Sequence, residues 1–71
     1  MIKSMNGQVD GIAVAIYRKG KFTITCKKSN GFYCATFHNG RYTNTTWYSK
    51  DKDEMNDCIK EQIKQGFKRE A

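Results

Sequence analysis

The chain has 71 residues, with 13 Lys and Arg against seven Asp and Glu and a net charge of +6. This length allows one small domain with a thin margin of stability, since such a chain buries only about 60% of its unfolded surface. The longest apolar run, Ile12 to Tyr17, is too short to span a bilayer and Met1 to Gln8 is no signal peptide, which predicts a soluble, cytoplasmic protein without membrane contact.

The first two predicted strands are joined by a short basic loop. Residues 12–17 alternate with the period of a half-buried strand, in which every second side chain is Ile or Val. Residues 18–20, Arg-Lys-Gly, are interpreted as a three-residue hairpin loop with glycine in the left-handed position. A two-residue loop would mix apolar and polar side chains on both faces, so the longer loop is preferred. The second strand covers residues 21–28.

Two Asn-Gly pairs, Asn30-Gly31 and Asn39-Gly40, predict further hairpins, because both central residues of a type I′ turn need positive φ. Treated as two-residue turns, they place Ile24 opposite Phe37 and bring the fourth strand back from residue 41. The resulting register collects apolar side chains on one face of the sheet. These are Ile12, Val14, Ile16, Phe22, Ile24, Cys26, Tyr33, Ala35, Phe37 and Tyr42.

A helix is predicted after the strands. Asp51 and Glu54 form a capping-box-like start, with Ser49 as a competing cap. Gly66 fits the C′ position, and the following Phe67 is expected to fold back near the helix end. One narrow apolar stripe faces the sheet, formed by Met55, Cys58, Ile59, Gln62 and Ile63.

These elements predict an α+β fold: a single four-stranded antiparallel β-meander packed on one C-terminal α-helix (ββββα). Residues 1–71 form one domain, with residues 1–8 and 68–71 frayed. The sheet face away from the helix is then exposed to solvent. It is predicted to carry Ala13, Ala15, Tyr17, Thr23, Thr25, Lys27, Phe32, Cys34, Thr36, His38, Arg41, Thr43, Thr45 and Trp47.

This exposed face combines aromatic and basic side chains, because the predicted register places Phe32 opposite Trp47 and His38 opposite Arg41. Aromatic rings stack on bases with about 1–3 kcal/mol each, and Lys and Arg bind phosphates. The alternative explanation is structural, since a cross-strand aromatic pair also stabilises a hairpin and Thr is a good strand former. The residues predicted to bind nucleic acid or another partner are Tyr17, Arg18, Lys19, Lys21, Lys27, Phe32, His38, Arg41 and Trp47.

No catalytic or metal-binding motif accompanies this surface. Cys26, Cys34 and Cys58 include no Cys-x-x-Cys pair, and with His38 they do not make a convincing zinc site. No carboxylate in the strands accompanies His38 as it would in a general base, and nothing identifiable lowers the pKa of Cys34. Phosphate-binding glycine loops are absent. We therefore expect no enzymatic activity, no metal and no cofactor.

The segment from Gly31 to Lys60 has a short Phe-Tyr strand, a turn with Gly40-Arg41, a strand ending at Trp47-Tyr48 and an acidic helix start. In this outline it resembles the small N-terminal arm-binding domains of tyrosine recombinases, which lay a sheet face into DNA and back it with one helix. The chain has one more predicted strand than is typical of that family. The resemblance implies DNA as a partner.

Two functions are expected from the sequence. The first is a small basic module that binds DNA or RNA through the exposed sheet face. The second is a small phage- or mobile-element-type accessory protein that binds and inhibits a host or bacterial protein through the same face. In that case aromatic and arginine side chains would dominate the interface, and a homodimer is a further alternative.

Overall fold

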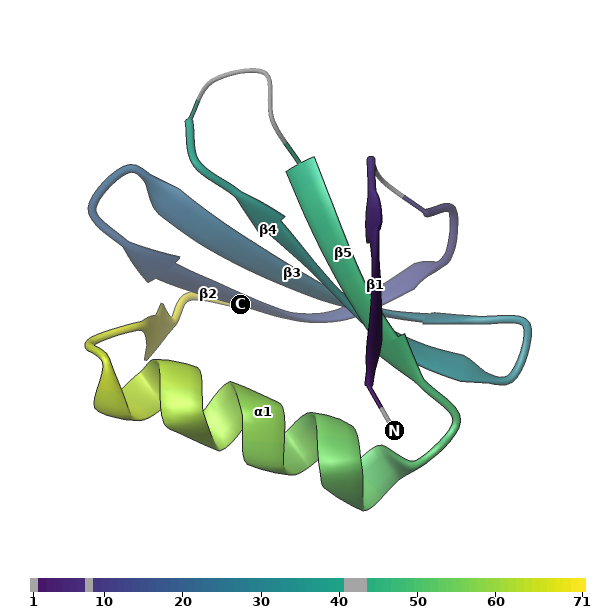
Figure 1. Ribbon diagram of the computed structural model, residues 1–71. Coiled ribbons are helices and arrows are strands. Elements are labelled where there is room, and N and C mark those ends of the chain that lie inside the picture. The colour runs from purple at the N-terminus through teal and green to yellow at the C-terminus, as the bar shows by residue number, and fades with distance from the viewer. Residues whose placement is uncertain (1, 8, 41–43) are drawn as a thin grey trace.

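The computed structural model describes residues 2–7, 9–40 and 44–71, and this part of the chain forms six antiparallel strands and one helix (Figure 1). The strands lie in the order β1-β5-β4-β3-β2-β6, and α1 covers one face of the sheet. The elements are β1 (Lys3–Asn6), β2 (Ile12–Lys19), β3 (Phe22–Ser29), β4 (Phe32–His38), β5 (Asn44–Ser49), α1 (Lys52–Lys64) and β6 (Lys68–Arg69). The α+β class, the antiparallel sheet and the C-terminal helix are as predicted, whereas the prediction of four strands is wrong.

The two additional strands come from segments that were expected to be frayed. β1 lies beside β5, with Lys3 opposite Tyr48, and so extends the meander at one edge. β6 lies beside the second half of β2, where Glu70 N donates to Ile16 O at 2.7 Å. Neither segment shows an apolar alternation, because its place in the sheet comes from backbone hydrogen bonds to a neighbour.

The β3–β4 hairpin has the predicted register. Asn30 and Gly31 have φ values of 49° and 81°, as a two-residue turn with two left-handed positions requires. Ile24 therefore lies opposite Phe37, on the face that α1 covers.

The predicted two-residue turn at Asn39-Gly40 is wrong. His38 pairs with Asn44, so residues 39–43 lie between the two strands and β5 is shifted by three residues relative to the prediction. An odd shift moves every side chain of a strand to the opposite face of its sheet. Tyr42, which was predicted in the core, lies outside the described residues.

Trp47 is the side chain most affected by this shift. It lies opposite Ala35 and faces α1, where its ring stacks on Phe37 with 6.3 Å between the ring centroids. The prediction that Trp47 lies on the open face is therefore wrong, and Tyr48 lies there in its place.

The β2–β3 hairpin also differs from its prediction, because its loop is Gly20-Lys21 and Lys19 pairs with Phe22. Gly20 has φ 60°, which suits the first position of a two-residue II′-type turn. This register places Tyr17 opposite Ile24 on the helix-covered face, where it packs against the core rather than facing solvent as predicted.

The first half of β2 lies outside the core. An irregularity between Ala13 and Ala15 shifts the register, and the side chains of Ile12 and Val14 are 77% and 58% exposed. Ile16 lies opposite Thr25, on the face away from α1. The prediction that these three aliphatic residues belong to the core is wrong.

Asp51 is the N-cap of α1, as predicted. Its side chain accepts hydrogen bonds from Asp53 N and Glu54 N, whereas Ser49 Oγ accepts one from Asp51 N and so does not compete for the first turn of the helix. Ile63 is exposed at the far end of the predicted apolar stripe. Within the described part of the chain, no helix is long and apolar enough to cross a membrane.

The C-terminal end of α1 returns the chain to the core. Gly66 has φ 114° and donates to Ile63 O, while Phe67 N donates to Gln62 O, which together form a Schellman motif. Phe67 is only 5% exposed and meets Phe37 edge to face, at 6.2 Å between centroids. The core cluster of the described residues comprises Ile24, Ala35, Met55 and Phe67.

The connection from β1 to β2 crosses the sheet, because these strands lie near opposite edges. We call Gly7 and residues 9–11 the crossover segment. It is held by side chains of the face away from α1: Thr46 Oγ1 donates to Gly7 O at 2.7 Å, and Lys27 Nζ donates to Val9 O at 3.1 Å. The face opposite the helix is therefore partly covered.

Candidate nucleic-acid interface

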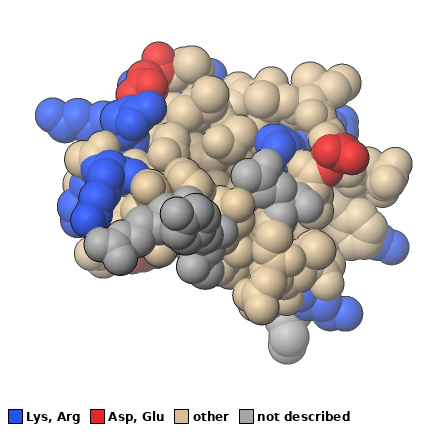
Figure 2. All heavy atoms as spheres, turned by 90° about the horizontal axis from the view of Figure 1, so that it is seen from above, with Lys and Arg blue, Asp and Glu red and all other residues tan. Residues whose placement is uncertain are grey.

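The crossover segment makes part of the open face a second, polar core. Cys34, Thr36 and Thr46 are buried there although they point away from α1. The hydroxyl of Thr46 donates its proton to Gly7 O. In the hydrogen bond between the two threonines, Thr36 Oγ1 is therefore the donor and Thr46 Oγ1, 3.0 Å away, is the acceptor. Seen from the side away from α1, the surface is mostly uncharged, and Lys and Arg lie mainly around its margin (Figure 2).

An aromatic pair stands at one end of this face. Phe32 on β4 and Tyr48 on β5 meet edge to face, with 5.6 Å between ring centroids and 80° between ring planes. Both rings are half-buried. Cys34 pairs with Tyr48 across the two strands, so Tyr48 shares the face of Phe32. The predicted aromatic pair therefore exists with Tyr48, not Trp47, as the partner of Phe32.

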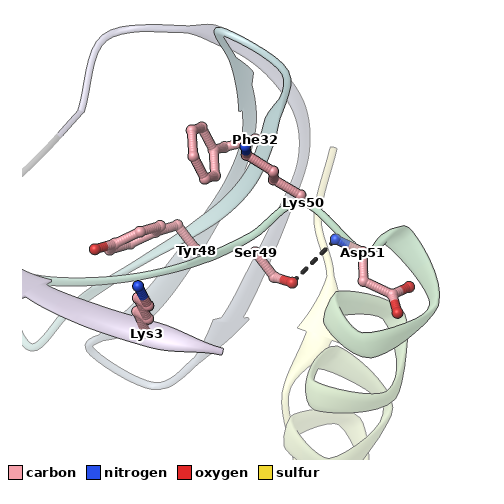
Figure 3. Close-up of a pocket in the computed structure, with 6 residues that line it drawn as sticks. All are labelled: Lys3, Phe32, Tyr48, Ser49, Lys50 and Asp51. Atoms are coloured by element: carbon pink, nitrogen blue, oxygen red, sulfur yellow. Dashed lines mark hydrogen bonds between the residues drawn. The ribbon is translucent and has the colours of Figure 1, made fainter. Parts of the chain in front are cut away.

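Two lysines flank the aromatic pair. Lys50 Nζ lies 5.3 Å from the centroid of the Phe32 ring, within the range of a cation–π interaction. Lys3 lies opposite Tyr48 on β1, and its ammonium group is on the side of the Tyr48 ring away from Phe32 (Figure 3). These side chains surround a depression of about 560 Å³, lined by Lys3, Phe32, Tyr48, Ser49, Lys50 and Asp51.

Among the described residues that line this depression, Asp51 is the acidic one. Its carboxylate is turned toward α1 and accepts hydrogen bonds from the first turn of the helix, at 2.9 Å for Asp53 N (Figure 3). Lys3 and Lys50 are exposed, so the charges directed to solvent at the aromatic pair are positive.

A second depression, of about 240 Å³, adjoins the same pair and is largely apolar. β1 and the crossover segment supply two of its walls, Met5 and Val9. It is lined by Met5, Val9, Ser29, Asn30, Phe32, Cys34 and Tyr48. Sequence reasoning missed the N-terminal residues because it treated residues 1–8 as frayed, and no periodicity in that segment signals otherwise.

Rings and ammonium groups on one sheet face are the combination that single-stranded nucleic acid binds. No family model, curated protein or solved structure matches the chain. The function of this face must therefore be derived from its own geometry and charge.

Two further predicted binding residues, Lys27 and His38, lie on the open face. Both have partners within the protein: Lys27 is bonded to Val9 O, and a hydrogen bond joins His38 Nδ1 to Asn44 Oδ1. They line a polar depression of about 230 Å³ with Thr23, Thr25, Thr36 and Asn44. His38 and Phe32 lie at opposite ends of β4, whereas Lys27 pairs with Cys34, which pairs with Tyr48. The structure therefore places His38 away from the aromatic pair and Lys27 two strands from Tyr48.

The remaining predicted binding residues lie elsewhere. The guanidinium of Arg18 forms an ion pair with Glu70, and this hydrogen bond raises the pKa of Arg18 and lowers the pKa of Glu70. Lys19 lies across from Phe22, with its side-chain end near Gly66. Lys21 is in the β2–β3 turn, Tyr17 and Trp47 pack against the core, and Arg41 lies outside the described residues.

The three thiols are not activated. Burial raises the pKa of Cys34 and of Cys58, and it raises the pKa of Cys26 to about 11. These thiols are therefore protonated at neutral pH. In the described residues, no three His, Cys, Asp or Glu side chains are grouped so that they would hold a metal ion.

Proposed function

We propose that the chain is a small nucleic-acid-binding module whose contact surface is the aromatic pair Phe32–Tyr48 with Lys3 and Lys50. The observation that carries this proposal is the placement of two half-buried rings and two exposed ammonium groups around one depression. Rings bind bases by stacking, and ammonium groups bind phosphates and release condensed counterions. The rings would thus contact the base of a nucleotide, and the ammonium groups would contact its phosphate.

The charge of the molecule supports the same proposal. The net charge is +6, and the carboxylate beside the site already caps α1. A positive protein attracts a polyanion over a distance of about a Debye length, roughly 10 Å at 0.1 M salt. Binding is therefore expected to be strong at low salt and to weaken steeply as salt is added.

The test is titration of a fluorescently labelled oligonucleotide with the protein at several salt concentrations. Phe32→Ala and Tyr48→Ala should each weaken binding by roughly 5- to 150-fold, since each removes a stacking ring worth about 1–3 kcal/mol. Lys3→Gln and Lys50→Gln should each reduce the magnitude of the negative slope of log affinity against log salt by about one.

The matched control is Lys60→Gln, which removes the same charge from α1 beside β2, away from the aromatic pair. It should change the affinity less than either site lysine does. Far-UV circular dichroism of every variant shows whether the fold is retained. If folded Phe32→Ala and Tyr48→Ala proteins bind as the wild type does, the proposal is wrong.

A second candidate function, binding of a protein, is favoured by the exposed start of β2. Ile12 and Val14 are large, apolar and exposed, and Ile63 of α1 is exposed as well. Within the described residues, β6 pairs with Tyr17 and Arg18, so the first half of β2 is an edge. An exposed edge pairs readily with an identical strand of a second copy, because antiparallel pairing of one strand with itself is symmetric.

Sedimentation velocity at two protein concentrations tests this second function. If two copies pair along β2, the sedimentation coefficient rises with concentration, and Val14→Lys abolishes the rise by charging the edge. Met5→Lys is the control, since it charges an exposed apolar residue on β1 instead. A monomer at both concentrations rules out self-association.

A further inference from the structure

The aromatic pair borders two depressions of different chemistry. The first is also lined by Lys3 and Lys50, with polar groups of the β5–α1 junction. The second is also lined by the apolar side chains of Met5 and Val9 and by the buried Cys34. Phe32 and Tyr48 line both depressions, so a ligand in contact with the rings meets a charged wall and an apolar wall at once.

A nucleotide has the same two-part chemistry, with a flat apolar base and a charged phosphate. In a duplex the faces of the bases are covered by stacking, and only their edges are presented in the grooves. A base can enter an apolar depression only when it is unstacked, as it is in a single strand or a loop.

The fold favours the same ligand. The grooves of a duplex are entered by a helix or by a protruding β-ribbon. Here α1 lies on the opposite face from the aromatic pair, and the open face that carries the pair is partly covered by the crossover segment. The crossover segment stands on the open face and supplies Val9 as one wall of the apolar depression, fixed by Lys27 Nζ at 3.1 Å from Val9 O. The apolar wall is thus tied to the sheet before any ligand arrives.

We infer that this interface takes a single-stranded nucleic acid, with one base in the depression formed by Met5, Val9 and Cys34 and the adjoining phosphates against Lys3 and Lys50. The inference rests on the proposed function and adds to it the strandedness of the ligand and the position of the base. Recognition is then by stacking and apolar contact, which tolerate many base sequences.

The experiment compares three labelled ligands of equal length at low salt: a single strand, the same sequence as a duplex, and a single strand of abasic sugar-phosphate units. The full single strand should bind at least about fivefold more tightly than the abasic strand, because the abasic strand keeps the phosphates but lacks the stacking bases. It should also bind more tightly than the duplex.

Met5→Thr tests the apolar wall without a change of charge, and Thr suits a strand. It should weaken binding of the full single strand by about fivefold and leave abasic binding unchanged. Val14→Thr is the control, since it also replaces an exposed apolar side chain by Thr, but away from the depression.

The outcomes separate the inference from the function on which it rests. If none of the three ligands binds at low salt, the proposed function fails and the inference fails with it. If the duplex or the abasic strand binds as tightly as the full single strand, nucleic-acid binding stands and the base position is wrong. If Met5→Thr weakens the full and the abasic strands equally, the apolar depression does not hold a base.

Discussion

Trp47 and Tyr48 are neighbours in the chain but lie on opposite faces of the sheet. Trp47 stacks on Phe37 beneath α1, whereas Tyr48 meets Phe32 on the other side. The side chain of Trp47 therefore stabilises the core, and that of Tyr48 forms part of the candidate interface. Aromatic character alone does not predict which residue lies on which face, because the register of β5 decides it.

Cys26 provides a pH test of the core at the same scale. Burial, with a smaller contribution from the neighbouring Cys58, raises the pKa of Cys26 from 9.0 to about 11. Between these pH values the unfolded chain has lost a proton that the folded protein retains, so the free energy of unfolding falls as pH rises through this window. Below about pH 9 the contribution is complete.

Urea unfolding at pH 8 and near pH 10.5 measures this effect. The fall in the unfolding free energy between the two pH values should be smaller in Cys26→Ala than in the wild type. The other thiols titrate in both proteins, so the difference between the two falls in unfolding free energy reports on Cys26. Equal falls in the wild type and in Cys26→Ala would show that Cys26 is not desolvated in the folded state.

At the scale of elements, two identical dipeptides behave differently. Asn30-Gly31 forms the expected two-residue turn, while Asn39-Gly40 begins a longer connection to Asn44. The longer connection places Trp47 beside Ala35, where it packs against the core. Burial of a large aromatic side chain stabilises this register, which the local turn signal does not predict.

This contrast explains how much of the structure the sequence predicts. The meander order, the helix with both caps and the β3–β4 register follow from local chemistry and are confirmed. The faces of β2 and β5 depend on loop length, where an error of one or three residues reverses every side chain. Phe32 was placed on the correct face, whereas Lys3 and Met5 reach the site through pairing of β1 with the distant β5, and Val9 reaches it through the crossover segment.

Gly66 supports a prediction about the end of α1. Its φ of 114° is unfavourable for a residue with a side chain, so Gly66→Ala should lower the free energy of unfolding by about 1–2 kcal/mol. The nearest atom to an added Cβ is the flexible Lys19 Cε, at 3.3 Å. Lys19→Ala should therefore not restore stability in the Gly66→Ala background, as urea titration of the double variant would measure. Full restoration would assign the cost to crowding instead.

On the scale of the whole molecule, the crossover segment forms a partial second layer on the face of the sheet away from α1. It runs from β1 to β2 over the sheet and buries the hydroxyls of Thr36 and Thr46. The sheet therefore has apolar packing on its helix side and hydrogen-bonded polar packing on part of the other side. This second layer gives a small protein additional buried surface.

Gly11 provides a test of how closely this layer is packed. A Cβ added to Gly11 would lie 2.8 Å from Lys28 O, a backbone atom that cannot move without the strand. Gly11→Ala should therefore lower the free energy of unfolding by about 1–3 kcal/mol, the usual cost of overpacking.

The neighbouring exposed residue supplies the control, since Asp10→Ala should change stability by no more than about 0.5 kcal/mol. Urea titration of both variants measures the difference. A Gly11→Ala protein as stable as Asp10→Ala would show that the crossover segment lies loosely on the sheet.

The pairing of β1 with β5 and the burial of Phe67 also govern how the protein matures during translation. β1 leaves the ribosome before β5, with which it pairs, and the core lacks one of its rings until Phe67 is made. Such distant contacts slow folding, because the chain loses the entropy of loop closure before the stabilising contacts form. A nascent chain arrested before Phe67 would hold an unfinished core and remain sensitive to proteases, and acquisition of protease resistance should coincide with emergence of that residue.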